Sequence, residues 1–419
     1  MLLTLSISAA NSLALQASGI RVATDRTWYL SGETMTVSVT ADNALIAYAE
    51  LCDTHGLAAG VMVGLKGGKG TGKMELSPDL HSGYYLLSVY TRGNAHVFQQ
   101  LVAVVNPLRK SVDDDMEWVE TNSLTPNPSP TGEGSNYIVG ENTSEEVSTP
   151  LPLWGEAGSE TEGHIIQARV RNDYDGQTFR ASQIRPSLSV VGKQIHFFEG
   201  KMVNDSIAVF YTYGIHGRLP LVLSAVSSTG VSLPIEIISP FAALLPKQLP
   251  HLVFHYNRSE VEARSLDMQR SRSHTSHLTP HTSSLSYDET VFGTHPDLSY
   301  NLDEYRQFLT IREVLLEYVK CVSKKKVNGV SQLFVRKEQE IYNTSMPTLV
   351  LIDGMSVFDV EQLLSYDARR VHYINIYGGQ YTFGNGIYNG ILSIVTRSGQ
   401  LTNYPIEHNM QYLEYDFPN

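Results

Sequence analysis

Apolar and polar residues alternate with a period of two along several short stretches of the chain, and this pattern predicts β-strands. Between residues 20 and 107 such stretches are separated by clusters of turn residues. They are Met35–Val39, Ala47–Leu51, Gly83–Thr91 and Val97–Val105. Short alternating strands at this spacing are typical of two packed antiparallel sheets. We therefore expect a first β-sandwich over residues 20–107.

The same alternation returns after residue 163 and predicts a second β-sandwich over residues 163–250. Its strand candidates are Ile165–Val170, Ser187–Val191, Ile207–Phe210, Leu221–Val226 and Ile235–Ile238. Tyr211, Tyr213 and His216 lie in this region and leave two interpretations open. They form a surface on which sugars stack, or they are ordinary core residues and cross-strand pairs, which is the commoner use of aromatic residues on sandwich strands.

After residue 299 the pattern becomes a mixture of strands and helices. Leu349–Ile352 is an apolar run closed by Asp353 and Gly354, which predicts a buried strand ending in a tight turn. A short helix with Asp359 as its N-cap follows. A strand, a glycine-containing loop and a further strand come next, and these strands are Val371–Tyr377 and Ile391–Thr396. We expect a small α/β domain over residues 299–400.

An amphipathic helix is predicted earlier in the same domain, over Leu302–Val319. Its apolar residues recur at helical spacing on one face, so we expect this face to pack against the sheet. Thr310 and Glu313 have the spacing of a capping box in the second half of the helix. Leu333–Arg336 then predicts the first strand of the domain.

Polar stretches separate and follow these domains. Residues 108–162 are rich in proline, serine and glycine, so we expect a disordered linker, with a peptide-binding proline motif as the alternative. Residues 251–298 predict a polar connector, and residues 401–419 a C-terminal tail. The connector carries Arg258, Arg264, Arg270, Arg272, His274, His277, His281 and His295. A metal site or contact with anionic lipid headgroups would use these side chains, but the histidines lack a rigid ligand spacing.

Composition and charge exclude one large class of function. The 419 residues have a formal net charge of −12 and a pI near 5.6, whereas nucleic-acid binding requires clustered cations. Hydrophobic residues make up 42% and charged residues 18% of the chain, which is typical of a globular protein. Beyond the first residues, no apolar run approaches the roughly 18 positions of a membrane-spanning helix. We predict neither a nucleic-acid partner nor a transmembrane helix.

Two further features receive structural interpretations. Cys52 and Cys321 are far apart in the sequence, and we expect buried thiols instead of a disulfide or a metal site. Gly67–Lys73 matches the glycine and lysine positions of a phosphate-binding loop, but Met74 replaces the Ser or Thr that would bind magnesium. Pro78 would also interrupt the helix that such a loop requires. We predict a glycine-rich hairpin and no bound nucleotide.

No known catalytic motif occurs in the sequence, and we predict a protein that is not an enzyme and has no cofactor and no metal site. Asp353, Asp359 and Asp367 come nearest to a carboxylate cluster. Asp353 is explained as a turn residue and Asp359 as a helix cap, and no convergent base or nucleophile accompanies the three.

The N-terminal residues Met1–Ser18 resemble a signal peptide. Their body is mildly apolar, but the first charged residue is Arg21, so the basic start of an ordinary signal peptide is missing. The resemblance implies export and a periplasmic or outer-membrane-associated location.

Two patterns in the first predicted sandwich resemble those of macroglobulin-type domains. One is D-x-x-x-Y-x-x-G-E before the second strand, and the other is G-x-Y-x-L-x-x-Y-T in a late strand. The matching positions are Asp25, Tyr29, Gly32, Glu33, Gly83, Tyr85, Leu87, Tyr90 and Thr91. The resemblance implies an adhesive or spacer module. The Cys-Gly-Glu-Gln thioester of proteinase-trapping macroglobulins does not occur in the sequence.

The segment from Pro347 to Gly399 resembles the plug domain of TonB-dependent outer-membrane receptors. Leu351–Gly354 is similar to the plug's I-D-G strand end, and Val371–Ile376 to its I-E-x-I-E-V strand. Tyr381–Gly399 resembles its closing hairpin. The structural motif positions are Asp353, Gly354, Gly384, Asn389, Gly390, Thr396 and Gly399. The residues after Gly399 are too few to form the membrane barrel of such a receptor.

The order of the predicted domains resembles multi-domain cell-envelope proteins of Bacteroidetes-like bacteria. It implies a non-enzymatic binding or scaffold protein whose plug-like domain docks on an outer-membrane uptake or secretion partner. An outer-membrane or periplasmic protein is therefore the expected partner, with peripheral association to the outer membrane as a further expectation. The alternative is a surface adhesin whose β-sandwiches bind carbohydrate or peptide.

Overall fold

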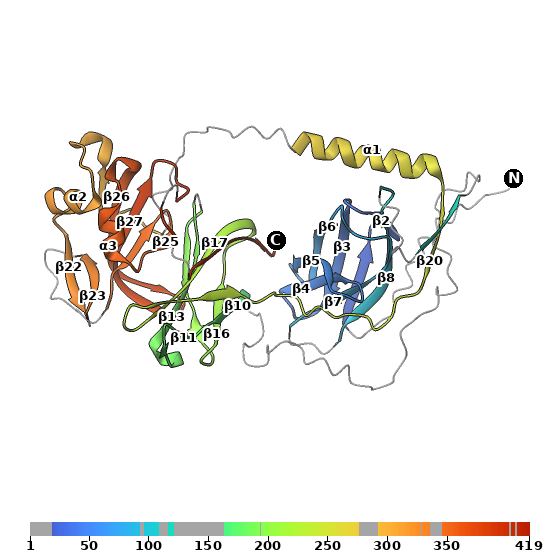
Figure 1. Cartoon of the computed structure of the whole chain (residues 1–419), viewed down its shortest axis with the longest axis horizontal. Coiled ribbons are helices and arrows are strands. Elements are labelled where there is room, and N and C mark those ends of the chain that lie inside the picture. Colours follow the sequence, from blue (N-terminus) through green and yellow to red (C-terminus); the bar gives the residue numbers. More distant parts are fainter. Residues whose placement is uncertain are drawn as a thin grey trace. The chain divides into compact units, whose positions relative to one another are not determined.

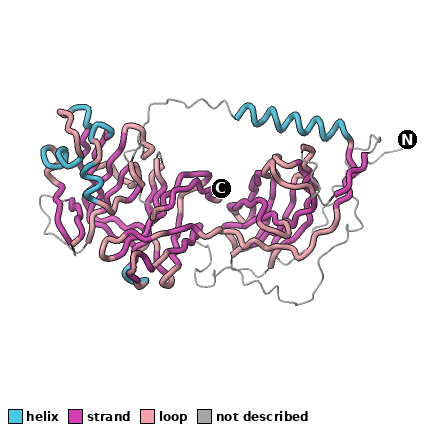
Figure 2. Tube along the Cα trace, in the orientation of Figure 1, coloured by secondary structure: helices cyan, strands magenta, loops and turns pink. Residues whose placement is uncertain are grey.

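The computed structural model describes residues 19–92, 96–108, 116–120, 163–192, 194–275, 292–327, 329–335, 346–401, 404–406 and 409–419. These residues form several sheets, which confirms the predicted multi-domain, mainly β fold (Figures 1 and 2). The chain divides into two compact units. The first unit comprises residues 1–162, 241–280 and 418–419, and the second comprises residues 163–240 and 281–417. Within the described ranges, no helix has the length and apolar character needed to cross a membrane.

The first unit is built on a β-sandwich. Its smaller sheet has the order β1-β3-β6, with β1 (Ile20–Thr24), β3 (Thr34–Ala41) and β6 (Lys69–Glu75). Its larger sheet has the order β2-β8-β7-β4-β5, with β2 (Trp28–Leu30), β4 (Ile46–Cys52), β5 (Leu57–Gly64), β7 (Gly83–Tyr90) and β8 (Phe98–Val105). Alternating side chains such as Val37, Leu51 and Val104 fill the core between the sheets. The period-two pattern therefore reflects one face of each strand packing inward.

A strand pair and a long helix complete the first unit. β9 (Met116–Glu120) pairs in parallel with β20 (Leu252–Tyr256), and α1 (Arg258–Thr275) follows β20. The ring of Phe254 lies edge-on to those of Trp28 and Trp118, with centroids 4.9 and 5.7 Å apart. These aromatic side chains bury each other. The predicted polar connector therefore contains a strand, β20, and a helix, α1. Part of the predicted linker forms the strand β9. Residues 121–162 and 276–291 lie outside the described residues.

The turn between β5 and β6 contains the glycines that resemble a phosphate-binding loop. Gly67 and Gly68 have φ angles of +60° and +75°, a backbone conformation that glycine adopts without a steric penalty. The chain continues into a strand and not into the helix whose N-terminus would bind phosphate. The glycine-rich segment is therefore a turn between two strands of different sheets, and not the predicted hairpin, because β5 and β6 do not pair with each other.

The second unit begins with another β-sandwich. One sheet has the order β15-β16-β10-β19, with β10 (His164–Val170), β15 (Lys201–Met202), β16 (Ile207–Thr212) and β19 (Ile235–Ile237). The other has the order β14-β13-β17-β18, with β13 (Ile184–Val190), β14 (His196–Glu199), β17 (Gly217–Ser227) and β18 (Ser232–Leu233). Between β10 and β13 lie β11 (Asp173–Tyr174), β12 (Gln177–Thr178) and η2 (Ala181–Gln183). Residues 241–250, which the sequence analysis assigns to this sandwich, belong to the first unit.

A C-terminal strand, β28 (Gln411–Phe417), adds to this sandwich by pairing antiparallel with β17. The inward side of β28 carries Gln411, Leu413, Tyr415 and Phe417, and the last two are buried. The hydroxyl of Tyr415 lies 2.7 Å from Nε2 of His164 at the start of β10. Much of the predicted C-terminal tail is therefore a sandwich strand. Neighbouring residues in the sequence give no sign of this, because its partner strand lies almost 200 positions earlier.

An α/β domain completes the second unit. Its sheet has the order β21-β26-β27-β24-β25, with β21 (Leu298–Asn301), β24 (Leu349–Ile352), β25 (Met355–Ser356), β26 (Val371–Phe383) and β27 (Gly386–Thr396). A two-stranded hairpin, the helices and the 3-10 turns accompany it: β22 (Val322–Val327), β23 (Val330–Val335), α2 (Ile311–Glu317), α3 (Val360–Ser365), η3 (Leu302–Glu304) and η4 (Ala368–Arg370). Helices α2 and α3 pack on one face of the sheet, where Val314, Leu363 and Ile374 are buried together.

The helix predicted over Leu302–Val319 is shorter than expected. The structure has the 3-10 turn η3 and then α2, because the side chain of Thr310 accepts a hydrogen bond from the amide of Glu313 and starts a new helix. The predicted capping box is confirmed, and so is the predicted cap of α3 by Asp359. A strong N-cap in the middle of a helical pattern thus marks the beginning of a helix.

Candidate functional site

The macroglobulin-like motif at the start of the first unit fixes a strand entry. Tyr29 donates a hydrogen bond to Oδ1 of Asp25 (2.7 Å), and the same oxygen accepts one from the amide of Thr36 (2.8 Å). Burial, reinforced by the Asp25 carboxylate, raises the pKa of Tyr29, so this hydroxyl remains a donor. The Asp and Tyr of the motif therefore tie the segment before β2 to β3.

The Glu of the same motif connects the sandwich to α1. Glu33 accepts hydrogen bonds from Nη2 (2.6 Å) and Nε (3.0 Å) of Arg264 and from the amide of Leu30 (2.8 Å). The guanidinium of Arg264 also lies 3.7 Å from the ring centroid of Trp28. A bidentate pair combined with a cation–π contact is specific to arginine. Gly32, with φ +87°, forms the turn that presents Glu33.

The later macroglobulin-like motif lies on β7. Gly83 begins the strand, and Tyr85 donates a hydrogen bond from its hydroxyl to the carbonyl of His81 (2.9 Å). Tyr90 donates to Glu50, a carboxylate on β4 that the sequence analysis does not identify. Both tyrosines are almost completely buried. The motif residues therefore serve packing and hydrogen bonding inside the unit.

In the α/β domain, Asp353 is the centre of the plug-like motif. Its side chain is 1% exposed and accepts hydrogen bonds from the amide (2.7 Å) and hydroxyl (2.6 Å) of Thr396 and from the amide of Leu401 (2.9 Å). Burial raises the pKa of Asp353, and the donors oppose that rise. Gly399 completes the loop by donating its amide to the hydroxyl of Thr396 (3.1 Å). Asp353 thus connects the end of β24 to the end of β27.

The glycines of the motif allow close approach to neighbouring segments. A Cβ on Gly354 would lie 2.9 Å from Cγ2 of Ile195 in the second sandwich, and one on Gly384 would lie 2.2 Å from the carbonyl oxygen of Glu199. Gly390, with φ +80°, lies against Val335. The amide of Asn389 donates to Pro347, at the start of the segment that enters β24. Two motif glycines, Gly354 and Gly384, therefore seat the α/β domain on the second sandwich.

A partly buried charged cluster reinforces that contact. Nη2 of Arg185 on β13 donates to Oε2 of Glu199 (2.8 Å) and to the hydroxyl of Tyr388 (3.0 Å), and Tyr388 also hydrogen-bonds Glu199. Burial raises the pKa of Tyr388, so it stays neutral and donates. A second contact joins the hydroxyls of Ser187 and Ser356 (3.2 Å). The α/β domain and the second sandwich consequently form one body.

The three aspartates of the α/β domain have separate structural roles and do not form a carboxylate cluster. Asp359 caps α3, and Asp367 caps η4 and pairs with Arg369, which lowers the pKa of Asp367. Asp353 is engaged as described above. Across the residues that the structure describes, no group of three or more His, Cys, Asp or Glu side chains is arranged to bind a metal ion. Of the connector's histidines, His277 and His281 lie outside the described residues.

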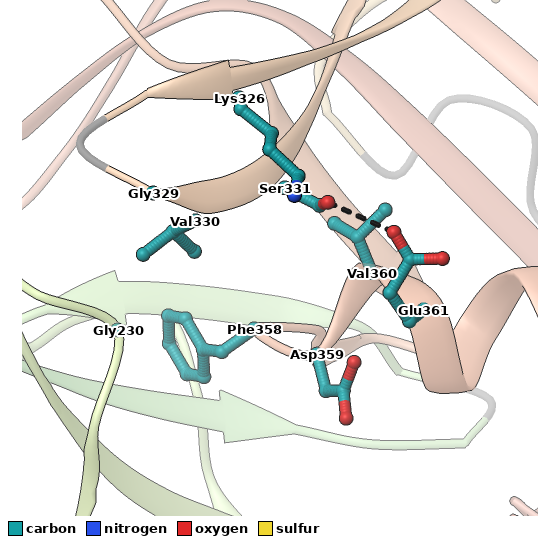
Figure 3. Close-up of a pocket in the computed structure, with 9 residues that line it drawn as sticks. All are labelled: Gly230, Lys326, Gly329, Val330, Ser331, Phe358, Asp359, Val360 and Glu361. Carbon is teal, nitrogen blue, oxygen red and sulfur yellow. Dashed lines mark hydrogen bonds between the residues drawn. The ribbon is translucent and has the colours of Figure 1, made fainter.

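A pocket of about 580 Å³ lies between the β22–β23 hairpin, the residues leading into α3, and the turn between β17 and β18 (Figure 3). Apolar side chains and backbone form part of its wall, and polar groups form the rest. The lining residues are Gly230, Lys326, Gly329, Val330, Ser331, Phe358, Asp359, Val360 and Glu361. Its volume is within the range of small-ligand sites, although its lining is more polar than that of most such sites. This pocket is the candidate functional site of the second unit.

The charges around the pocket are only partly neutralised. Glu361 forms ion pairs with Lys324 and with Nη2 of Arg312 (2.8 Å), and Ser331 donates to it (2.8 Å). Lys324, followed by Arg312 and Ser331, lowers the pKa of Glu361 to about 2. Lys326 is exposed, and its ammonium group forms no hydrogen bond or ion pair with any residue that the structure describes. One ammonium group therefore remains available at the pocket.

From the sequence, Asp359 is predicted only as a helix cap, and this pocket is not predicted. The run Lys324–Lys326 is the signal that could have found it, because period-two alternation places Lys324 and Lys326 on the same face of a strand. Gly230 and Phe358 come from distant parts of the chain. Gly230 and Phe358 are close together only because the α/β domain packs against the second sandwich.

The predicted aromatic surface of the second sandwich is partly exposed. The side chains of Tyr211 and Tyr213 are 51% and 59% exposed. The ring of Tyr213 lies edge-on to that of Phe198, with centroids 5.4 Å apart. Of the two cysteines, Cys52 is buried and Cys321 half-buried, and both are free thiols. Burial raises the pKa of Cys52 to about 12, which makes it a poor nucleophile.

Comparisons with known proteins show similarity only at the level of distant structures. No protein-family model and no curated protein matches the chain. The chain is similar to native alpha-2-macroglobulin of E. coli and to Salmonella alpha-2-macroglobulin reacted with methylamine, each at 12% identity and a TM-score of 0.19. The alignments cover 55% and 57% of this chain but only 15% and 16% of those chains. At that TM-score the β-sandwich assignment depends on the sheets described above, and the resemblance of Pro347–Gly399 to a receptor plug stays a prediction.

Proposed function

We propose that this chain is a non-enzymatic binding and scaffold protein of the cell envelope, whose α/β domain docks on an outer-membrane uptake or secretion partner. The observation that carries the proposal is the pocket beside Lys326, which belongs to a body stiffened by the contacts between the α/β domain and the second sandwich. The resemblances of Met1–Ser18 to a signal peptide and of Pro347–Gly399 to a plug support the envelope location.

The contacts inside the second unit indicate which surface is open to a partner. The turn at Gly354, Ser356 and the hairpin tip at Gly384 all contact the second sandwich. On the part of the domain that carries α2, Leu309 and Leu316 are 63% and 76% exposed. Contiguous exposed apolar side chains are a feature of protein-binding surfaces. The partner therefore docks on the surface of α2, α3 and the β22–β23 hairpin.

The charge and apolar surface of the pocket indicate which side chains of the partner would bind there. Lys326 supplies an ammonium group that is not engaged in an ion pair with a described residue, and Phe358 and Val330 supply apolar surface. An acidic side chain next to an apolar one would satisfy both. Such a contact gives specificity more than raw affinity, because an exposed ion pair contributes only about 0.2–1 kcal/mol.

Affinity capture tests this proposal directly. The purified chain is immobilised and exposed to detergent-solubilised cell envelope, and bound proteins are identified by mass spectrometry. We expect an outer-membrane barrel protein to be recovered by the wild type and by the control variant Lys201→Glu, which changes an exposed lysine of the second sandwich. Recovery should fall several-fold with Lys326→Glu. Equal recovery by all three chains, or recovery of no envelope protein, would overturn the proposal.

Cell fractionation tests the location independently. We expect the chain in the periplasmic or outer-membrane fraction of its native cells. A chain found only in the cytoplasm contradicts the envelope function, whatever the capture experiment shows.

The exposure of Tyr211 and Tyr213 favours one alternative, a carbohydrate-binding adhesin. Tyr211 lies near the end of β16 and Tyr213 directly follows the strand, and exposed aromatic rings can stack on sugar rings. Glycan-array binding that is lost in the double variant Y211A/Y213A but kept in K326E would favour the adhesin. Binding that the double variant retains excludes this surface.

A further inference from the structure

β4 of the first unit is buried along its whole length, although only one of its faces meets the sandwich core. Its inward side chains, Ala47, Ala49 and Leu51, belong to that core. Tyr48 and Glu50 alternate with them and therefore lie on the outer face of the sheet. Both are 0% exposed. The outer face must be covered by a further part of the chain.

The cover is the segment Phe241–Leu244, which we call the strap. It has no regular secondary structure and belongs to the first unit, where Figure 1 shows the chain passing the sheet of β4 and β7 on its way to β20. Oε2 of Glu50 accepts a hydrogen bond from the amide of Ala243 (3.0 Å), and Oε1 accepts one from the amide of Leu244 (2.6 Å). The strap is therefore bound through its backbone.

A third backbone donor of the strap is used by Tyr90. Its hydroxyl accepts a hydrogen bond from the amide of Ala242 (2.7 Å) and donates to Oε2 of Glu50 (3.1 Å). Ala243 has a φ of +54°, which turns successive amides toward one point. Such an arrangement of amides is an anion-binding nest, and the carboxylate of Glu50 is its anion.

One side chain of the strap has a defined slot. The ring of Phe241 lies where a Cβ on Gly60 would stand, with ring carbons 2.7–2.9 Å from that position. The ring is edge-on to Tyr48, with centroids 6.3 Å apart, and the guanidinium of Arg92 lies over the face of Tyr48, 4.9 Å from its centroid. Because Gly60 pairs with Glu50 across the sheet, the slot and the carboxylate are adjacent. Glycine is required at this point for an aromatic ring to lie on the sheet.

The use of a carboxylate is informative about what the outer face recognises. Burying an ionised carboxylate is costly unless donors surround it, and apolar packing alone would cover the same surface at lower cost. The carboxylate of Glu50 accepts hydrogen bonds from two backbone amides of the strap and from the hydroxyl of Tyr90. Without the strap, a carboxylate and an aromatic slot would face solvent side by side. This combination selects an aromatic side chain followed by consecutive free amides.

We propose that the outer face of β4, β5 and β7 is a peptide-binding site built from Gly60, Tyr48, Glu50 and Tyr90, and that the strap occupies it as an intramolecular ligand. Its ligand is a short segment with an aromatic residue followed by three residues that have free amide groups. The occupant that fits is the strap of a second copy of this chain, because it carries the same residues in the same order. Exchange of such an identical segment costs little in contacts.

The test is a peptide titration against the full-length chain. A fluorescein-labelled peptide of residues 238–247, which represents the strap of a second copy, is titrated by fluorescence anisotropy. We expect the F241A chain to bind it at least about tenfold more tightly than the wild type, since the wild-type strap competes for the slot at high effective concentration. In the double variant E50Q/F241A the affinity should fall by about tenfold, because one amide loses its acceptor.

A peptide in which the phenylalanine is replaced by alanine serves as the matched control and should bind weakly to every chain. Thermal unfolding of each variant tests whether the first unit remains folded. If F241A unfolds, the chain Ala242→Pro, which removes one strap amide, replaces it. Peptide binding that E50Q leaves unchanged, or no saturable binding to a folded strap variant, overturns the proposal. Neither result affects the proposed docking of the α/β domain, which uses another unit.

Discussion

Each unit of this protein contains a buried carboxylate that accepts backbone hydrogen bonds, and the two differ in where their donors come from. Asp353 is bound by groups at the end of β27 and just after it, within the domain that Asp353 itself helps to form. Glu50 is bound by the strap, about 190 residues away in the sequence. Burial raises the pKa of both groups. The same chemistry thus closes a domain in one unit and fastens a distant segment in the other.

The difference shows how the two units are assembled. Asp353 sits in a turn at φ +47°, a conformation that Asp and Asn tolerate better than most residues, so its position is set partly by its own backbone. Glu50 lies in the middle of a strand and has no local role. Its burial depends on whether the strap is in place. The first unit is therefore completed by a part of the chain that follows the second sandwich.

The largest effect should come from removing the carboxylate of Asp353. D353A leaves several buried donors without an acceptor, and we expect it to lower the free energy of unfolding of the second unit by about 3–4 kcal/mol. Urea denaturation followed by far-UV circular dichroism measures this change. The control D359A, which removes only the exposed cap of α3, should cost about 1 kcal/mol. Equal losses in the two variants would contradict the central role of Asp353.

A somewhat smaller loss should follow from G354A. The residue has a φ of +90°, and its new Cβ would lie 2.9 Å from Cγ2 of Ile195 and from the carbonyl oxygen of Val190. Backbone strain and this contact together should cost about 2–3 kcal/mol, measured by the same denaturation experiment. Gly56 has open space around its Cα, so G56A should change stability little. A stable G354A chain would mean that the α/β domain seats less closely on the second sandwich.

The substitution E50Q should have a moderate effect that is confined to the first unit. The amide NH₂ of glutamine meets a strap amide where an acceptor is required, so we expect a loss of about 1–3 kcal/mol. Hydrogen exchange should speed up at the amides of Ala243 and Leu244 while the core of the sandwich stays protected. The control is E75Q, at an exposed position on β6. If exchange rises equally in both variants, Glu50 does not hold the strap.

The smallest effect concerns pH. A carboxyl group whose pKa is raised in the folded state binds a proton more strongly there than in the unfolded chain. Its contribution to stability is therefore complete below its pKa in the unfolded chain, which is about 4. The contribution is lost as the pH rises through the pKa in the folded protein. The stability difference between wild type and D353N should therefore be larger at low pH than at neutral pH. Glu361, whose pKa is lowered from 4.5 to about 2, should show the opposite trend, with its contribution to stability lost as the pH falls from 4.5 through about 2. Denaturation curves at several pH values distinguish the two directions.

The features predicted correctly depend on residues close together in the sequence, whereas the features that were missed depend on contacts between distant segments. The alternating strands of both sandwiches, the cap at Asp359 and the capping box at Thr310 and Glu313 are confirmed by the structure, because each depends on residues within a few positions of one another. The helix predicted over Leu302–Val319 is interrupted by the same capping box. The pocket at Lys326 was not predicted, since its lining comes from separate segments of the second unit.

The sequence by itself determined the mainly β fold, the turn at Asp353 and the glycine-rich turn at Gly67 and Gly68, because strand periodicity and turn preferences are properties of short segments. Only the tertiary structure decided which segments complete each unit. The strap covers Glu50, and β28 pairs with β17, through contacts between residues far apart in the chain. Such pairings depend on the burial of whole faces, which neighbouring residues do not encode.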